Sequence, residues 1–197
     1  MKNRHNNQEK PRIPPGQFIT KRFPVLQKGG VVHLDRDTYK LSIVGEVETP
    51  ITFSFQDLEK LIDTEIIADI HCVTSWSKLD TKWGGISFKT LFNLIKPKKS
   101  AHFVEFFCAD EGFTTTVPIE RLKAENAILA LNYDGLPIND KHGGPVRPII
   151  PNLYFYKSAK WVIKINFLEE DRLGYWERGA YSNKADPWKE QRYSYQD

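Results

Sequence analysis

Residues 71–85 read HCVTSWSKLDTKWGG, and the rest of the chain is interpreted around this stretch. The preceding residues, 66–72, are rich in β-branched side chains and predict a strand that ends at Cys72. The stretch itself holds two Trp, two Gly and one His, and we interpret it as a loop. Functional sites are often built on loops at the ends of strands, so Cys72 is the first candidate for chemistry.

Four interpretations of Cys72 are open from the residue alone. The side chain is a small buried hydrophobe, a nucleophile, a zinc ligand or a soft thiolate ligand of a redox metal. A nucleophile needs a base, and the candidates are His71, His102 and His142. Neighbouring strand residues point to opposite faces, which disfavours His71, while His142 could serve. The two cysteines, Cys72 and Cys108, show no C-x-x-C spacing typical of zinc sites.

The flanking sequence predicts more strands than helices. Apolar alternation predicts a strand from Tyr39, and further strands are predicted over 101–109, 113–117, 127–132, 146–150 and 161–168. Ser54 and Ser87 precede apolar residues at helical spacing and predict two short helices. We expect an α+β fold with mixed or antiparallel sheets. Residues 1–17 predict an extended N-terminal arm and residues 18–197 a single domain.

The composition excludes several classes of protein. Hydrophobic residues make up 40% and charged residues 27% of the 197 residues, which is typical of a soluble globular protein. No apolar run approaches the ~20 residues of a membrane span, so an integral membrane protein is not expected. The net charge of +3 comes from dispersed residues and argues against a nucleic-acid partner. Two cysteines and no visible export signal lead us to expect a cytoplasmic location.

Two further clusters suggest anion binding. Residues 142–148, HGGPVRP, combine a glycine pair with Arg147, which suits a phosphate cradle; the structural alternative is a hairpin turn with an exposed Arg. Residues 154–161, YFYKSAKW, place Lys157, Ser158 and Lys160 close together as a second phosphate grip. Aromatic residues reach 13% and gather in the last third of the chain, which is consistent with a pocket for a large planar group.

Several separated motifs together resemble one family. The segment HCVTSWSKLDTKWGGISFKTL resembles the molybdenum-ligand segment of the sulfite oxidase-like molybdopterin oxidoreductases. GGPVRPIIPNLYFYKSAKWV resembles their pterin-phosphate segment, and GYWERGAYSNKADPWKEQRYS resembles the C-terminal tail of their short prokaryotic members. PPGQ and RFPVL near the N-terminus fit the same members. The resemblance covers roughly residues 14–195 and implies the sulfite oxidase-like fold.

The resemblance also implies site residues. Cys72 falls on the single thiolate ligand to molybdenum. Cys108 and His142 fall where the methionine-sulfoxide-reducing relatives carry a cofactor-contacting Thr and an Asn. The other implied cofactor-binding residues are Arg22, Phe23, Arg147, Ser158, Ala159 and Lys160. We add Trp76 and Trp83 as expected walls of the substrate pocket.

The activity implied is two-electron oxygen-atom transfer. The cofactor is molybdenum held by one pterin dithiolene, and no haem is expected. The substrate is a small molecule, either a sulfite-like oxyanion or an S- or N-oxide, and a separate electron-transfer partner is expected. The chain resembles the bare catalytic domain, without the twin-Arg signal of the periplasmic relatives. The alternatives are a cofactor-free member that acts as a binding module and a Cys-dependent hydrolase.

Overall fold

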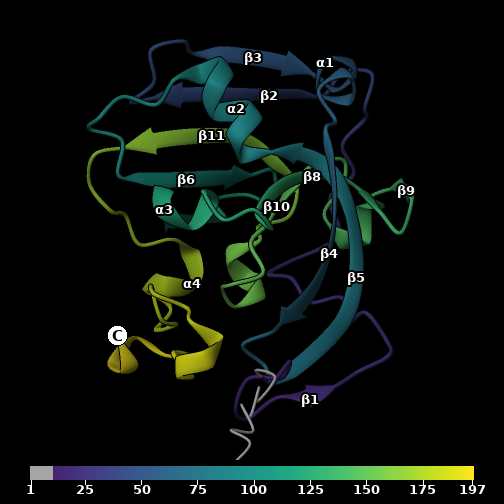
Figure 1. Cartoon of the computed structure of the whole chain (residues 1–197), viewed down its shortest axis with the longest axis vertical. Helices are drawn as coiled ribbons and strands as arrows, with labels where there is room; N and C mark the ends of the chain where they lie inside the picture. The colour runs from purple at the N-terminus through teal and green to yellow at the C-terminus, as the bar shows by residue number, and fades with distance from the viewer. Residues whose placement is uncertain (1–10) are drawn as a thin grey trace, which may run out of the picture.

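Two mixed β-sheets form the frame of the protein, and short helices connect their strands (Figure 1). The computed structural model describes residues 11–197. One five-stranded sheet runs in the order β3 (Ile51–Ser54), β2 (Lys40–Gly45), β11 (Val162–Leu168), β6 (Phe103–Cys108) and β7 (Thr114–Pro118). Its neighbouring strands are antiparallel except for the parallel pair β2 and β11.

The six-stranded second sheet is built on one long strand. β5 (Trp76–Ser87) pairs with β4 (Thr64–His71), with β8 (Ile128–Tyr133) and, in parallel, with β1 (Phe18–Ile19). β10 (Arg147–Ile149) and β9 (Leu136–Pro137) pair with β8. The expected α+β class with mixed sheets is confirmed.

The two predicted helices are present and are capped as expected. Ser54 Oγ accepts from the Asp57 amide at 3.2 Å, while Asp57 accepts from the Ser54 amide at 3.1 Å, a reciprocal capping box. Ser87 Oγ accepts from the Thr90 amide at 3.2 Å. The helices are α1 (Phe55–Lys60), α2 (Phe88–Ile95), α3 (Ile119–Leu122) and α4 (Tyr175–Arg178), and the 3-10 turns are η1 (Asp140–His142), η2 (Phe155–Lys157), η3 (Pro187–Lys189) and η4 (Ser194–Gln196).

The interpretation of residues 71–85 as a loop is wrong for most of the stretch. Only residues 72–75 form a turn, and β5 begins at Trp76. The charged residues of β5 conceal its strand character, but buried Thr81 and Trp83 alternate with more exposed neighbours. Gly85 is required because a Cβ there would lie 2.2 Å from the Leu129 carbonyl oxygen of β8. The strand pairs on both sides, and this double pairing offsets its polar composition.

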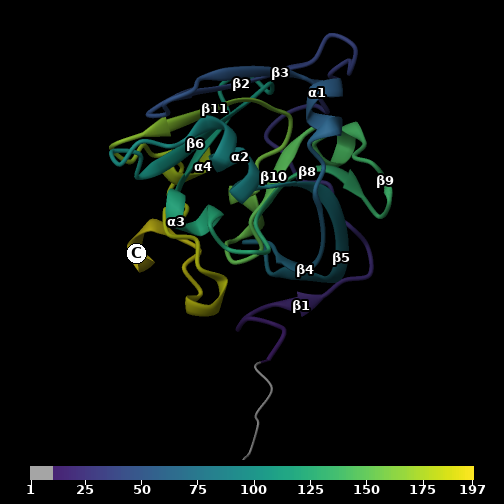
Figure 2. The same ribbon diagram turned by 45° about the horizontal axis from the view of Figure 1, so that its top comes forward.

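The first described residues and the C-terminal tail lie at the same end of the molecule (Figure 2). Part of the predicted arm, residues 1–10, lies outside the described residues. Arg12 donates to Asp69 at 2.7 Å and to Asp80 at 2.6 Å, which ties the arm to the β4–β5 pair. Arg192 Nη2 reaches the Gly16 carbonyl at 3.3 Å. The division at residue 17 stays a prediction. No helix in residues 11–197 has the length and apolar character that crossing a membrane requires.

Candidate active site

A cavity collects residues from distant parts of the chain. It is bounded by the segment after β1, the turn between β4 and β5, the loop between β6 and β7, the stretch from η1 to Trp161 and the C-terminal tail. Eight of the residues predicted from the sequence line it: Phe23, Cys72, Trp76, His142, Arg147, Ser158, Ala159 and Lys160. The sheets thus bring together motifs that the sequence keeps up to about 140 residues apart.

The turn after β4 holds Cys72 at the cavity wall. The Cys72 amide donates to the Trp76 carbonyl at 2.8 Å, and the Ser75 amide donates back to the Cys72 carbonyl at 3.0 Å. Ser75 has a φ of 76°, a left-handed conformation that closes the turn. Gln17 donates a further bond to the Cys72 carbonyl at 3.1 Å. The main chain of Cys72 is therefore fixed from both sides, while its Sγ contacts only Thr74 Oγ1, at 3.2 Å, among its hydrogen-bond partners in residues 11–197.

Burial controls the protonation of the thiol. It raises the pKa of Cys72, and the Thr74 hydrogen bonds and the charge of Arg192 oppose this rise. Without a metal the side chain is therefore a thiol at neutral pH, and a bound metal cation would displace its proton. His71 is not placed to act as its base, because the buried His71 ring bonds Ser77 Oγ at 2.8 Å.

Arg147 places a positive charge in the interior. Its side chain is 1% exposed, and its Nη1 donates to the His142 carbonyl at 2.7 Å. Nη2 donates to the Ser158 carbonyl. Burial lowers the pKa of Arg147 to about 9, since no carboxylate pairs with it among the described residues. The alternative of an exposed turn arginine is therefore wrong, and the guanidinium is held by neutral carbonyls that leave its charge uncompensated.

Lys160 and His142 extend this cationic end of the cavity. Lys160 Nζ donates to the Lys141 carbonyl at 2.8 Å and to Gln27 at 3.2 Å. Burial and the charge of Arg147 lower the pKa of Lys160 to about 7. The same two causes, burial first, lower the pKa of His142 to about 4, so that its ring is neutral at pH 7. This end of the cavity favours an anion.

Gly143 explains how η1 approaches Lys160 so closely. A Cβ on Gly143 would lie 2.7 Å from Lys160 Cβ, and the residue has a φ of 93°. Only glycine combines this conformation with this close approach at low cost. The glycine pair noted in the sequence therefore brings backbone and cation together.

Three predicted residues do not line the cavity. Arg22 is exposed, and Cys108 and Trp83 are buried outside the lining. The Trp83 indole donates to Thr81 at 2.8 Å and packs its ring edge against Phe23, with centroids 6.1 Å apart. We therefore correct its expected role, because Trp83 packs in a small core cluster with Ile128, Ala130, Ile138 and Ile149 instead of lining the cavity.

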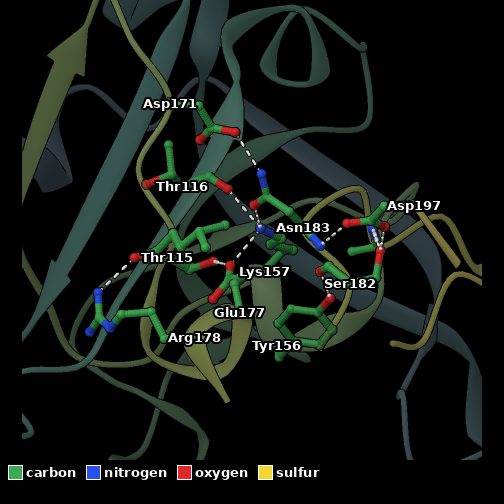
Figure 3. A network of polar contacts seen from close by, with 12 residues as sticks. Thr115, Thr116, Tyr156, Lys157, Asp171, Glu177, Arg178, Ser182, Asn183 and Asp197 are labelled. Carbon is green, nitrogen blue, oxygen red and sulfur yellow. Dashed lines mark hydrogen bonds and ion pairs between the residues drawn. The ribbon is translucent and has the colours of Figure 1, made fainter. Parts of the chain in front are cut away.

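The fold also places Lys157 away from the cavity. It was expected to grip phosphate beside Lys160, but its amine is fully buried and bonds Glu177 at 2.5 Å (Figure 3). Lys157 is not part of the cavity lining, although its neighbours Tyr156 and Ser158 both line the cavity. Ser158 Oγ itself accepts from the Ile150 amide at 3.0 Å.

The sequence analysis expected an aromatic pocket but did not name the residues of this aromatic wall. Tyr156, Trp176 and Tyr181 line the cavity together with Cys72 and Val73. The rings of Trp176 and Tyr181 are stacked with centroids 5.5 Å apart, and those of Tyr156 and Tyr181 are 5.4 Å apart. The only sequence signal was the gathering of aromatic residues toward the C-terminus.

Comparison with known proteins identifies the class. Residues 28–176 match the family described as Oxidoreductase molybdopterin binding domain. The uncharacterized oxidoreductase YuiH of Bacillus subtilis is 40% identical over 185 residues, which are 93% of each chain. The protein-methionine-sulfoxide reductase catalytic subunit MsrP of Campylobacter jejuni is 29% identical, over 76% of this chain and 56% of that relative. The chain thus spans little more than half of the MsrP subunit.

A solved structure shows the same fold. The sulfane dehydrogenase SoxCD from Paracoccus pantotrophus superposes with a TM-score of 0.67 at 21% identity, over 79% of this chain and 43% of that one. The fold and the matches define a sulfite oxidase-like oxidoreductase. The chain belongs to the oxidoreductase molybdopterin-binding domain family, and its cofactor is molybdenum–molybdopterin. The family favours the redox-metal interpretation of Cys72 over the hydrolase, the zinc protein and the cofactor-free binding module.

The cavity residues fit this cofactor. Trp76 Nε1, His142 Nδ1 and Arg147 Nε are buried and have no hydrogen-bond partner within residues 11–197. Asp110 Oδ1, on another lining residue, also has no partner among the described residues. Buried polar atoms are nearly always bonded, so four such atoms on residues around one cavity indicate a missing polar partner. A pterin ring and its phosphate carry the nitrogen and oxygen atoms that these groups lack. Arg147 has no carboxylate partner among the described residues, and the charge of Asp110 only partly balances that of Lys160, so both side chains fit the phosphate.

Proposed function

We propose that the protein reduces small, uncharged S-oxides, with the molybdenum bound by Cys72. The observation that carries the proposal is the wall beside Cys72, which consists of Val73 and the rings of Tyr156, Trp176 and Tyr181. An oxyanion such as sulfite requires cations at this wall. The cations that line the cavity are engaged elsewhere: Arg147 and Lys160 suit the cofactor phosphate, and Lys28 donates to the Glu111 carbonyl at 2.5 Å. Arg192, whose charge acts on Cys72, lies outside the lining and donates to the Val73 carbonyl at 2.6 Å.

Reduction of an S-oxide requires only protons and an electron donor besides the substrate. An S-oxide takes up two electrons and two protons, its S–O bond breaks, and a thioether and water are released. The electrons come from a separate redox partner, and we place the reaction in the cytoplasm. The bound cofactor supplies a metal that changes oxidation state by two electrons and exchanges one oxygen atom.

The residues of this chain would bind the cofactor, orient the substrate and shield both from water. Arg147 and Lys160 would hold the phosphate, and a charge-assisted hydrogen bond of this kind contributes roughly 1.5–3 kcal/mol. The aromatic wall excludes water and packs against the apolar groups of the substrate. Burial raises the pKa of Tyr181, so its hydroxyl stays protonated and the ring adds no charge to the wall. The named relative MsrP is consistent with a sulfur substrate.

The test starts from protein made in a host that synthesises the cofactor. We expect about one molybdenum per chain and electron-donor-dependent reduction of dimethyl sulfoxide and methyl phenyl sulfoxide. Oxidation of sulfite with an artificial acceptor is measured in parallel. Faster sulfite oxidation than S-oxide reduction would overturn the choice of substrate, and zinc or no metal would overturn the cofactor assignment.

A further inference from the structure

Lys157 is the centre of a buried polar network behind the cavity wall (Figure 3). Its amine donates to the Thr116 carbonyl of β7 at 2.8 Å, to Glu177 Oε1 of α4 at 2.5 Å and to Asn183 Oδ1 of the tail at 3.2 Å. The side chains of Lys157 and Glu177 are 0% and 1% exposed. One amine therefore joins three segments that are separate in the sequence.

Stability alone does not explain such a pair. Two charges lose much of their hydration when they are buried, and replacing a buried ion pair by apolar residues often leaves stability unchanged or improves it. Removing one partner, in contrast, is strongly destabilising because the other charge stays buried and unpaired. A role in fixing the arrangement of the connected segments is the remaining physical reason to keep the pair.

The positions of the partners show which arrangement is fixed. Lys157 directly follows Tyr156 in the chain, and Glu177 directly follows Trp176. Asn183 lies two residues after Tyr181. Each member of the clamp, which we define as Lys157, Glu177 and Asn183, is thus adjacent or nearly adjacent to one ring of the cavity wall.

The tail needs such a clamp because it has little regular structure. Between α4 and η3 the chain forms only turns and an isolated bridge between Tyr181 and Tyr193. Additional bonds act on the same segment: Tyr156 donates from its hydroxyl to the Ser182 carbonyl, and Asp197 accepts from the Asn183 amide at 2.8 Å. Ser182 Oγ also donates to Asp197. The rings of the wall keep their places through these polar contacts.

We propose that Lys157 is a positioning residue that holds the two halves of the aromatic wall together and so sets which S-oxides fit beside Cys72. One half is the η2 turn with Tyr156, and the other is the segment with Trp176 and Tyr181. The choice of substrate in this statement rests on the proposed function. When the clamp is removed, the halves separate, and the packing of the rings against a large substrate group is lost.

The main variant is the double substitution Lys157→Met and Glu177→Gln, which removes both charges together and leaves no unpaired ion in the interior. Asp197→Ala is a second, milder variant, because this exposed residue can be changed without burying an unpaired charge. Lys82→Met is the matched control, since it breaks an exposed pair with Glu65 on β4 and β5. All are prepared as molybdenum-loaded holoenzyme and compared by circular dichroism.

Two readouts separate positioning from mere stability. The first is kcat/KM for methyl phenyl sulfoxide and for dimethyl sulfoxide: the double variant should lose at least about tenfold on the aryl substrate and under threefold on the smaller one. The second is amide hydrogen exchange over residues 176–183, which should become at least tenfold faster. Asp197→Ala should show the same pattern with smaller changes, and Lys82→Met should match the wild type.

An equal loss of kcat/KM on both S-oxides, together with unchanged amide hydrogen exchange over residues 176–183, would overturn the positioning role. So would a double variant that behaves like the wild type. If the double variant fails to fold, Asp197→Ala decides, and unchanged selectivity together with unchanged exchange in that variant rejects the proposal. If the wild type reduces neither S-oxide, the proposed function fails, and the clamp is judged by hydrogen exchange alone.

Discussion

The two ends of the cavity are built differently. The cationic end, with Arg147, Lys160 and His142, stands on β10 and on turns that the glycine pair draws close to the sheets. The end at Cys72 is closed by Tyr156 of the 3-10 turn η2, Trp176 of the one-turn helix α4 and Tyr181 of the irregular tail, and none of the three stands on a sheet strand. Tyr181 lies beyond residues 28–176, the part that matches the family.

This difference matches two tasks. A cofactor shared by a family presents the same phosphate to every member, so its cations belong on the rigid scaffold. A substrate differs between members, and its wall belongs on segments that can change without disturbing the sheets. The polar clamp then gives the irregular end the order that the sheets give to the other end.

The largest expected effect comes from the thiolate end. Cys72→Ser should reduce S-oxide turnover to background while the fold is kept, because a hydroxyl is a hard and mostly protonated ligand. Cys108→Ser should lower the melting temperature but change turnover less than threefold, since Cys108 is buried outside the cavity lining. Turnover assays and thermal melts of Cys72→Ser and Cys108→Ser check this contrast between the two cysteines. Equal losses of activity in both variants would contradict it.

The next effect tests the cationic end. Lys160→Ala and Arg147→Ala should weaken cofactor binding about ten- to hundredfold, from ~1.5–3 kcal/mol per lost charge-assisted bond. Arg147→Ala should also lower the melting temperature, because the carbonyls of His142 and Ser158 lose their donor. Exposed Arg22→Ala serves as the control. The molybdenum-to-protein ratio measures cofactor binding, and circular dichroism measures folding and the melting temperature. Full metal content in Arg147→Ala and Lys160→Ala would refute the assignment of these residues to the phosphate.

The smallest effect is a dependence of stability on pH. The pKa of Lys160 is about 7 in the folded protein and 10.5 ordinarily, so between these pH values the unfolded chain binds more protons and stability rises with pH. Cofactor-free protein should therefore gain melting temperature from pH 7 to 10 relative to Lys160→Met. The phosphate of the bound cofactor favours the charged amine, so this gain should shrink in the holoenzyme. The melting temperatures of cofactor-free wild type and cofactor-free Lys160→Met are measured across this pH range. An identical change of melting temperature with pH in both proteins would contradict the prediction.

Local chemistry was readable without the structure. The Ser54 and Asp57 capping box, the Ser87 cap and the alternation around Leu41 depend on contacts a few residues apart, and all are present. The motifs around Cys72 and Arg147 also indicated the family, because their residue types follow the needs of a metal and a phosphate. The assignment of Cys72 as the metal ligand stays a prediction.

Other features depended on partners distant in the chain. β5 looks like a loop because its charges are tolerated only where β4 and β8 pair with it on both sides. Trp83 and Trp76 are alike in sequence, and the path of β5 decides that only Trp76 lines the cavity. The sequence alone therefore determined most local elements, with the exception of β5, as well as the family and the residue types of the site. The tertiary structure decided that Lys157 faces Glu177 rather than a phosphate and that Tyr181 reaches Cys72's cavity, because burial and pairing depend on which distant segments meet.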